Sequence, residues 1–194
     1  MGYSSNQYDN GSLVASQRSF GLISTSSLIY GFCRGGTTGT SVNTAEIHNA
    51  VILITSAISS ANLQTSTAQS SMGILTKEGI EGYTIGGYQV AATPLSTCDK
   101  VVYATRQGSV VSGMALSTAR TGGNSLDHDG YEGYVIGGNS NGNFNGTFYQ
   151  TSDKVRYAVQ ITAADSNTNC PLARCLASAC SQGESFGYIL GGYI

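Results

Sequence analysis

Tryptophan is absent from this chain of 194 residues, proline occurs only twice, and charged residues make up 10 % of the sequence. This charged share is well below the roughly 25 % of an ordinary globular domain. The formal net charge is −2, so the clustered Lys and Arg side chains that neutralise nucleic-acid phosphates are missing. We therefore expect no nucleic-acid partner.

The N-terminus and the apolar runs carry no membrane signal. Residues 1–11 are polar and lack both the basic and the apolar segment of an export signal. The longest apolar run, about Ala50–Ile54, is far shorter than the roughly 20 residues that span a bilayer. We expect a chain that is made in a cytoplasm and is not inserted into a membrane.

Residues that hold metals or redox groups are few and irregularly placed. The five cysteines do not recur at any fixed period, and the two histidines lie apart from them. We predict buried free thiols, no metal and no cofactor, with a disulfide or metal site among Cys170, Cys175 and Cys180 as the alternative. Asp127, His128 and Asp129 resemble an acid/base cluster, but we expect them in a hairpin turn.

A repeat dominates what the sequence does contain. A Gly-aromatic-x-x-Gly-Gly motif begins at Gly31, Gly82, Gly133 and Gly187, so its steps are 51, 51 and 54 residues. The motif ends in the glycine pairs Gly35 and Gly36, Gly86 and Gly87, Gly137 and Gly138, and Gly191 and Gly192. A second marker, at Arg18, Gln69, Arg120 and Arg174, keeps the same steps. Two markers that share one period predict a repeat architecture.

Each repeat reads as four short strands. In the third repeat, a run of small residues (121–126) precedes the predicted turn at 127–130, and an apolar strand over 131–138 follows. Val and Tyr alternate after Asp153 and, 54 residues earlier, after Asp99, which predicts a third strand. A weaker fourth strand is expected over 158–166. The first repeat has His48 and the four residues after it where the others have Asp-Lys-Val-x-Tyr.

This order of strands and markers resembles the kelch repeat over about residues 15–194. The missing Trp departs from the usual kelch pattern, and the Tyr-Gly-Gly-rich, weakly charged version is more similar to divergent kelch-like proteins of bacteriophages and cyanobacteria. The resemblance implies an all-β fold, a kelch-like β-propeller or propeller-like array. It would contain about 3.5–4 repeats of roughly 51 residues, each a four-stranded antiparallel blade.

We interpret residues 1–194 as a single domain of such blades. The predicted blades are 18–61, 69–114, 120–166 and 174–194, and the last is completed either by residues 1–16 or by another chain. Strand edges left open on so uncharged a chain favour self-association, so a homo-oligomer or other structural proteins of an assembly are the expected partners.

Several recurring residues are assigned structural roles. The glycine pairs are expected to allow close backbone approach or positive φ. Asp99 and Asp153 are expected to bond turn amides, with Lys100 and Lys154 as solvated charges at the strand edge. For Arg18, Arg120 and Arg174, hydrogen bonds between blades are favoured over ligand binding.

The third repeat carries three extra residues in the loop 139–150, and loops on a rigid scaffold commonly carry binding specificity. The candidate binding residues combine amides with aromatic rings that can stack on a sugar or pack on a protein. They are Asn141, Asn143, Phe144, Asn145, Phe148 and Tyr149. The alternative is a flexible loop without a ligand.

The sequence favours a non-enzymatic structural or attachment protein of a phage virion, such as a tail, tail-fibre or decoration component assembled in the host cytoplasm. The main alternative is an extracellular or cell-surface adhesin that binds a protein or a surface glycan. A propeller oxidase, the third class, needs several His and Tyr copper ligands, and two distant histidines make it the remotest reading.

Overall fold

The chain is all-β in the computed structural model. The structure describes residues 22–23, 30–34, 45–49, 54–57, 59–62, 72–77, 80–89, 92–128, 130–143, 145–182 and 186–194. Its described strands form three four-stranded sheets and one hairpin, all antiparallel, and the described helices are three single turns of 3₁₀ type: η1 (Ser59–Ala61), η3 (Ser112–Met114) and η4 (Ser166–Thr168).

Each sheet is a meander in which consecutive strands pair. Unit 1 comprises β1 (Leu22–Ile23), β2 (Tyr30–Arg34), β3 (Ala45–Asn49) and β4 (Ile54–Ala57). Unit 2 comprises β5 (Met72–Lys77), β6 (Glu81–Ile85), β7 (Cys98–Val102) and β8 (Gln107–Val110). Unit 3 comprises β9 (Asn124–His128), β10 (Glu132–Ile136), β11 (Ser152–Arg156) and β12 (Ile161–Ala164). The C-terminal hairpin comprises β13 (Ser178–Gln182) and β14 (Phe186–Leu190).

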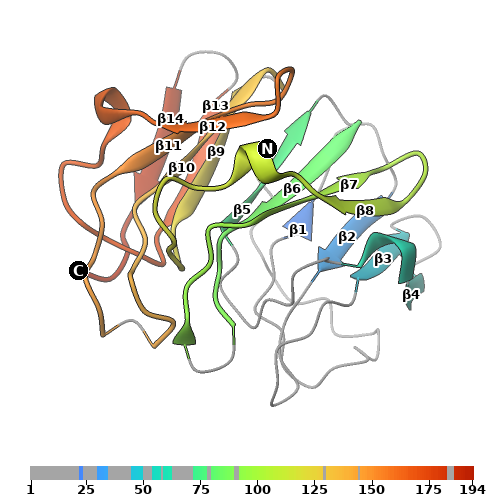
Figure 1. Cartoon of the computed structure of the whole chain (residues 1–194), viewed down its shortest axis with the longest axis horizontal. Coiled ribbons are helices and arrows are strands. Elements are labelled where there is room, and N and C mark those ends of the chain that lie inside the picture. Colours follow the sequence, from blue (N-terminus) through green and yellow to red (C-terminus); the bar gives the residue numbers. More distant parts are fainter. Residues whose placement is uncertain are drawn as a thin grey trace.

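The units follow one another side by side (Figure 1). The first strands make the contacts between units, because β1 lies against β5, β5 against β9, and β9 against β13. The successive sheets therefore lie against one another, and buried apolar side chains of units 2 and 3 meet between these two units. This is how a repeat too small to have its own core becomes stable.

The described core lies between units 2 and 3. Fully covered side chains from both sheets meet there, and Met114 of η3 joins them. The members of this cluster are Tyr83, Ile85, Cys98, Val111, Met114, Leu116, Val135, Val155 and Tyr157. The apolar strand predicted over 131–138 and the third strands predicted after Asp99 and Asp153 correspond to β10, β7 and β11.

The predicted turn at 127–130 is wrong in its first half. Asp127 and His128 lie in β9, opposite Gly133 and Glu132 of β10, and Asp129 lies outside the described residues. The small-residue run, predicted as a strand from residue 121, enters the sheet only at Asn124. Its first residue, Thr121, instead forms an isolated bridge with Asn139. The small residues 121–123 therefore precede the strand and are not part of it.

Candidate functional site

Arg120 joins two units through its backbone. Its carbonyl accepts a hydrogen bond from the N–H of Gly87 at 3.1 Å, and its own N–H donates to Leu95 O at 3.1 Å. Arg174 repeats this arrangement one unit later, accepting from Gly138 N–H at 2.8 Å and donating to Tyr149 O at 3.2 Å. Each arginine is thus fixed to the preceding unit, and its side chain extends from equivalent points.

The side chain of Arg120 binds unit 3. It is fully buried and forms an ion pair with the equally buried Asp153 of β11. The same guanidinium donates to the hydroxyl and the carbonyl of Thr151, at 2.8 and 3.0 Å. Asp153 also accepts the N–H of Ser117, at 3.3 Å. Burial lowers the pKa of Arg120, and the Asp153 carboxylate opposes this shift. The two terminal nitrogens of the guanidinium are therefore used within the protein, while Nε is buried without a hydrogen-bond partner.

An acidic residue recurs at one register position of every described third strand. Asp153 is opposite Val135, Asp99 is opposite Thr84, and Glu46 is opposite Cys33. The sequence alignment that placed His48 at the Asp position of the other repeats was therefore wrong by two residues. Glu46 stands at that position in unit 1. Arg18 and the pair Gly35 and Gly36 lie outside the described residues.

A second recurring cluster links a glutamate, a lysine and a tyrosine on one face of each sheet. In unit 3, Lys154 Nζ lies 2.7 Å from Glu132, and the Tyr134 hydroxyl donates to Glu132 at 2.8 Å. In unit 2, Lys100 Nζ lies 3.2 Å from Glu81. The lysines, predicted as solvated edge charges, are half-buried and ion-paired. Both glutamates were missed, although Glu-Gly-Tyr stands at the same point of both repeats.

Electrostatics in the unit 3 cluster favour the charged pair. Burial acts to raise the pKa of Glu132, but hydrogen bonds from Lys154 and Tyr134 outweigh it, and the pKa lies below its ordinary value. The hydrogen bond with Glu132 raises the pKa of Lys154 despite its partial desolvation. Lys154 also lies over the Tyr134 ring, 5.5 Å from the centroid. The cluster links β10 to β11, so we assign it a structural role.

The C-terminal hairpin offers the equivalent positions without the equivalent partners. Among the described residues, β14 pairs only with β13, and the guanidinium of Arg174 donates to Gly191 O, at 2.9 Å. No described carboxylate forms an ion pair with Arg174, and its Nε, like that of Arg120, is buried without a hydrogen-bond partner. Within the described part of the chain, the hairpin therefore presents a strand edge without a partner, with a cation beside it.

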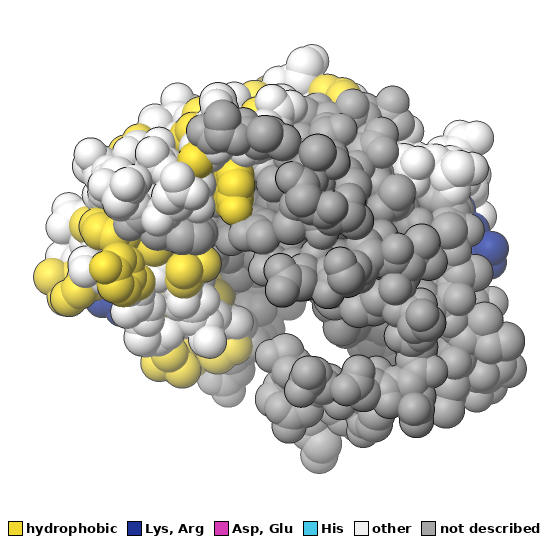
Figure 2. All heavy atoms as spheres, turned by 90° about the horizontal axis from the view of Figure 1, so that it is seen from below, with side chains coloured by type: hydrophobic (Ala, Val, Ile, Leu, Met, Phe, Trp, Pro, Cys, Tyr) yellow, Lys and Arg dark blue, Asp and Glu magenta, His cyan; other side chains and the backbone are white. Residues whose placement is uncertain are grey.

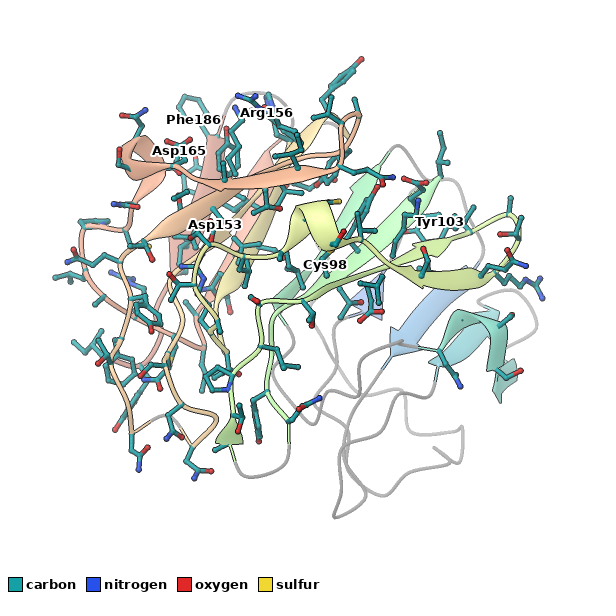
Figure 3. All side chains as sticks on the ribbon, viewed as in Figure 1. Cys98, Tyr103, Asp153, Arg156, Asp165 and Phe186 are labelled. Atoms are coloured by element: carbon teal, nitrogen blue, oxygen red, sulfur yellow. The ribbon has the colours of Figure 1, made fainter. Side chains whose placement is uncertain are left out.

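Apolar side chains of this hairpin face solvent. Leu190 is 61 % exposed, whereas Ile85 and Ile136 at the same position of units 2 and 3 are 0 % and 5 % exposed. Phe186 is 64 % exposed and lies at the periphery, while Asp153 lies in the interior (Figure 3). Figure 2 shows hydrophobic side chains gathered on the left of the lower face, the side that carries the hairpin in Figure 1. The exposed apolar residues in this part of the chain also include Leu172, Leu176, Tyr188, Tyr193 and Ile194.

The loop 139–150 is ordered by its own polar groups. The side-chain oxygen of the buried Asn139 accepts the N–H of Asn141, and the side-chain oxygen of Asn141 accepts the N–H of Asn143, both at 2.8 Å. Ser140 Oγ accepts the N–H of Thr147, also at 2.8 Å. The Asn141 oxygen is therefore used inside the loop, whereas Asn143 and Asn145 are exposed. Phe144 lies outside the described residues.

Aromatic rings of this loop contact neighbouring units. Phe148 packs edge-on against Tyr193, with centroids 5.5 Å apart. On the other side, Gly142 donates to Ala92 O at 3.0 Å and sits against the Tyr88 ring, where a Cβ would approach ring carbon Cδ2 to 2.5 Å. Tyr149 is half-buried. The structure thus brings Phe148 together with Tyr193, which the sequence reading did not include.

Other candidate groups do not form a reactive centre in the described part of the chain. No three His, Cys, Asp or Glu side chains gather there as a metal site would require. Cys98, Cys170 and Cys175 are buried free thiols and Cys180 is an exposed one, and burial raises the pKa of Cys170 and Cys175. Asp127 accepts the Tyr157 hydroxyl at 2.7 Å.

No helix among the described residues has the length and apolar character of a membrane span. No protein-family model matches the chain. No curated protein matches it either.

Proposed function

We propose that this chain is a non-enzymatic structural or attachment protein of a phage virion, built as a divergent kelch-like propeller array. In this proposal it is assembled in the host cytoplasm into a tail, tail fibre or decoration. Its partners are further copies of itself or other structural proteins, and it takes no cofactor.

The open edge of the C-terminal hairpin carries the proposal. Phe186, Tyr188 and Leu190 are exposed in β14 by 64, 47 and 61 %, whereas the matching strands of units 2 and 3 are paired on both sides. An apolar strand edge of this kind is a template for pairing with another segment. A hairpin with an apolar strand edge of this kind is suited to pairing with a further segment.

The propeller part of the proposal is supported by how the units meet. Their first strands lie next to one another, and their fourth strands lie at the far side of each sheet. The arginine at the start of a unit bonds to the preceding unit in the same way at two successive junctions. A constant junction geometry, repeated about four times, is what closes a ring of blades.

Native mass spectrometry and light scattering of the purified chain test the assembly. We expect an oligomer that dissociates on dilution and that is weakened by Leu190→Lys, because a charge then sits on the apolar edge. Ile161→Lys, in exposed β12, is the matched control. A clean monomer whose stability does not change when residues 1–14 are deleted would remove both the oligomer and the idea that this segment closes the last unit.

A surface adhesin that binds glycan is the second candidate, because the loop 139–150 combines Phe148, which packs on Tyr193, with the exposed Asn143 and Asn145. Aromatic rings with nearby amides suit the apolar and hydroxylated faces of a sugar. Glycan-array binding that is lost in Phe148→Ala favours this candidate. Capsid, portal or tail genes on either side of the coding sequence favour the virion.

A further inference from the structure

We propose that the open edge of β14 receives an extended segment of a partner chain that carries an acidic side chain opposite Ile189, and that Arg174 binds this carboxylate. The inference rests on the assembly part of the proposed function and names what the partner must contribute. Its evidence comes from the other units, in which the same edge is occupied.

The register fixes where the acid must stand. Val135, Thr84 and Cys33 hold the fourth position of β10, β6 and β2, and each faces an acidic residue of the third strand. Ile189 holds that fourth position in β14. If a strand paired with β14 as β11 pairs with β10, the residue that corresponds to Asp153 would therefore lie opposite Ile189.

The position of Arg174 indicates that this residue of the partner strand is acidic. Arg120 and Arg174 are bonded through their backbones to equivalent atoms of the preceding units. Arg120 then finds the carboxylate of Asp153, while no described acid reaches Arg174. A carboxylate supplied at this position would form a charge-assisted hydrogen bond with the Arg174 guanidinium.

The neighbouring positions define the rest of the segment. Two residues after the acid, Val155 faces Gly133 and Val101 faces Gly82, and both valines are fully buried. The partner strand is therefore expected to place an aliphatic residue opposite Gly187. Such a residue would be covered by the sheet, as the two valines are.

The middle residue is expected to differ from the lysine of units 2 and 3. There, Lys100 and Lys154 bind Glu81 and Glu132, but Phe186 stands at the glutamate position of β14. In unit 1, Tyr30 replaces the glutamate and Ile47 replaces the lysine. The loss of the acid thus accompanies the loss of its cation. The segment that fits β14 reads acid, apolar, aliphatic.

Labelled peptides that copy residues 150–158 test this site on the full chain. The peptide with Lys154→Ile carries the expected pattern, the unchanged peptide keeps the lysine, and a third peptide combines Lys154→Ile with Asp153→Asn. We expect fluorescence anisotropy to show the first binding more tightly than the second, and the third about tenfold or more weaker than the first. Hydrogen exchange is expected to slow at the β14 amides that point away from β13.

The protein variant Arg174→Gln is expected to lower the affinity for the acidic peptide by a similar factor and to leave the Asn peptide unaffected. Arg106→Gln is the matched control, because Arg106 is an exposed arginine of unit 2. Equal binding of the Asp and Asn peptides, unchanged binding by Arg174→Gln, or no binding at all overturns the inference. So does protection of the outward β14 amides before peptide is added, since the edge would then already be occupied.

The two proposals fail separately. A monomer that still discriminates the Asp peptide from the Asn peptide keeps the site and removes the homo-oligomer. An oligomer that binds both peptides equally keeps the assembly and removes the role given to Arg174.

Discussion

Tyr83 of unit 2 stacks on Tyr157 of unit 3, with ring centroids 5.4 Å apart and ring planes 10° apart. Both rings are completely buried, yet each hydroxyl has an acidic partner in its own unit: Tyr83 donates to Glu81 at 2.5 Å and Tyr157 to Asp127 at 2.7 Å. The stack therefore binds two units through apolar surface, while the polar end of each ring is satisfied locally.

This pair predicts a loss of stability in alkali. Burial, followed by the nearby carboxylates, raises the pKa of both tyrosines above the ordinary value of about 10. A raised folded-state pKa contributes stability that is complete below about pH 10 and is lost as the pH rises above it. In a spectrophotometric titration, we expect these two phenols to ionise only together with the loss of the β-sheet circular dichroism signal. Their ionisation in a chain that stays folded would contradict the burial.

The Arg120 and Asp153 pair predicts a large cost for removing one partner. In Arg120→Ala the buried carboxylate of Asp153 loses its cation, which costs about 3–5 kcal/mol in comparable cases. We expect urea denaturation to show this loss, and to show a smaller one for the double variant Arg120→Met, Asp153→Leu. Arg156→Ala, at an exposed arginine of β11, is expected to change the free energy of unfolding by less than about 0.5 kcal/mol. A cost of Arg120→Ala no larger than that of the control would contradict the clamp.

The repeat could be predicted from the sequence because its marker residues form the same backbone hydrogen bonds in successive units. Gly87 and Gly138 donate to Arg120 and Arg174 in equivalent ways, so spacing alone reveals the junction. Positions filled by exchangeable residues were harder to find. Glu46 stands at the same register position as Asp99 and Asp153. It was not recognised because unit 1 has Glu in place of Asp, and because the number of residues between its second and third strands differs from that of units 2 and 3.

The candidate surfaces could be predicted only in part. The loop 139–150 was identified from its extra length, but its contact with Tyr193 comes from the packing of the next unit. The exposure of Leu190 could not be read from its apolar character, because the equally apolar Ile85 and Ile136 are buried at the same position of β6 and β10. Exposure here follows from which strand lies beside β14, a tertiary fact that local patterns do not contain.

Glu132 predicts an acid-dependent contribution to stability. Its folded-state pKa is lowered, so it stabilises the fold above the unfolded value of about 4.3, and this contribution is lost as the pH falls through the folded pKa. We expect Glu132→Gln to destabilise by about 1 kcal/mol at pH 7. The difference from the natural chain should vanish near pH 3, measured as midpoints of urea unfolding. A difference that stays constant down to that pH would show that Glu132 acts through packing instead of charge.

Gly137 and Gly191 hold the same position of successive units and nearly the same backbone, with φ of +71° and +68°. A Cβ at Gly137 would lie 2.6 Å from the carbonyl oxygen of Arg174, whereas a Cβ at Gly191 meets nothing within 4 Å. Both alanine substitutions incur the cost of positive φ, about 1 kcal/mol, but only Gly137→Ala adds a backbone clash. We therefore expect it to cost about 1–3 kcal/mol more than Gly191→Ala in dilute solution.

The same pair of variants reports whether the array continues. The oxygen that crowds Gly137 belongs to the arginine that opens the next unit, so a unit that docked beyond the hairpin in the same way would crowd Gly191 too. Under conditions in which the chain assembles, Gly191→Ala is then expected to weaken the association between chains. In dilute solution, the same variant is expected to lower the free energy of unfolding only by the cost of positive φ, about 1 kcal/mol. Native mass spectrometry of the two variants at matched concentrations measures this. If Gly191→Ala assembles as well as the natural chain, the contact between chains does not repeat the junction between unit 3 and the C-terminal hairpin.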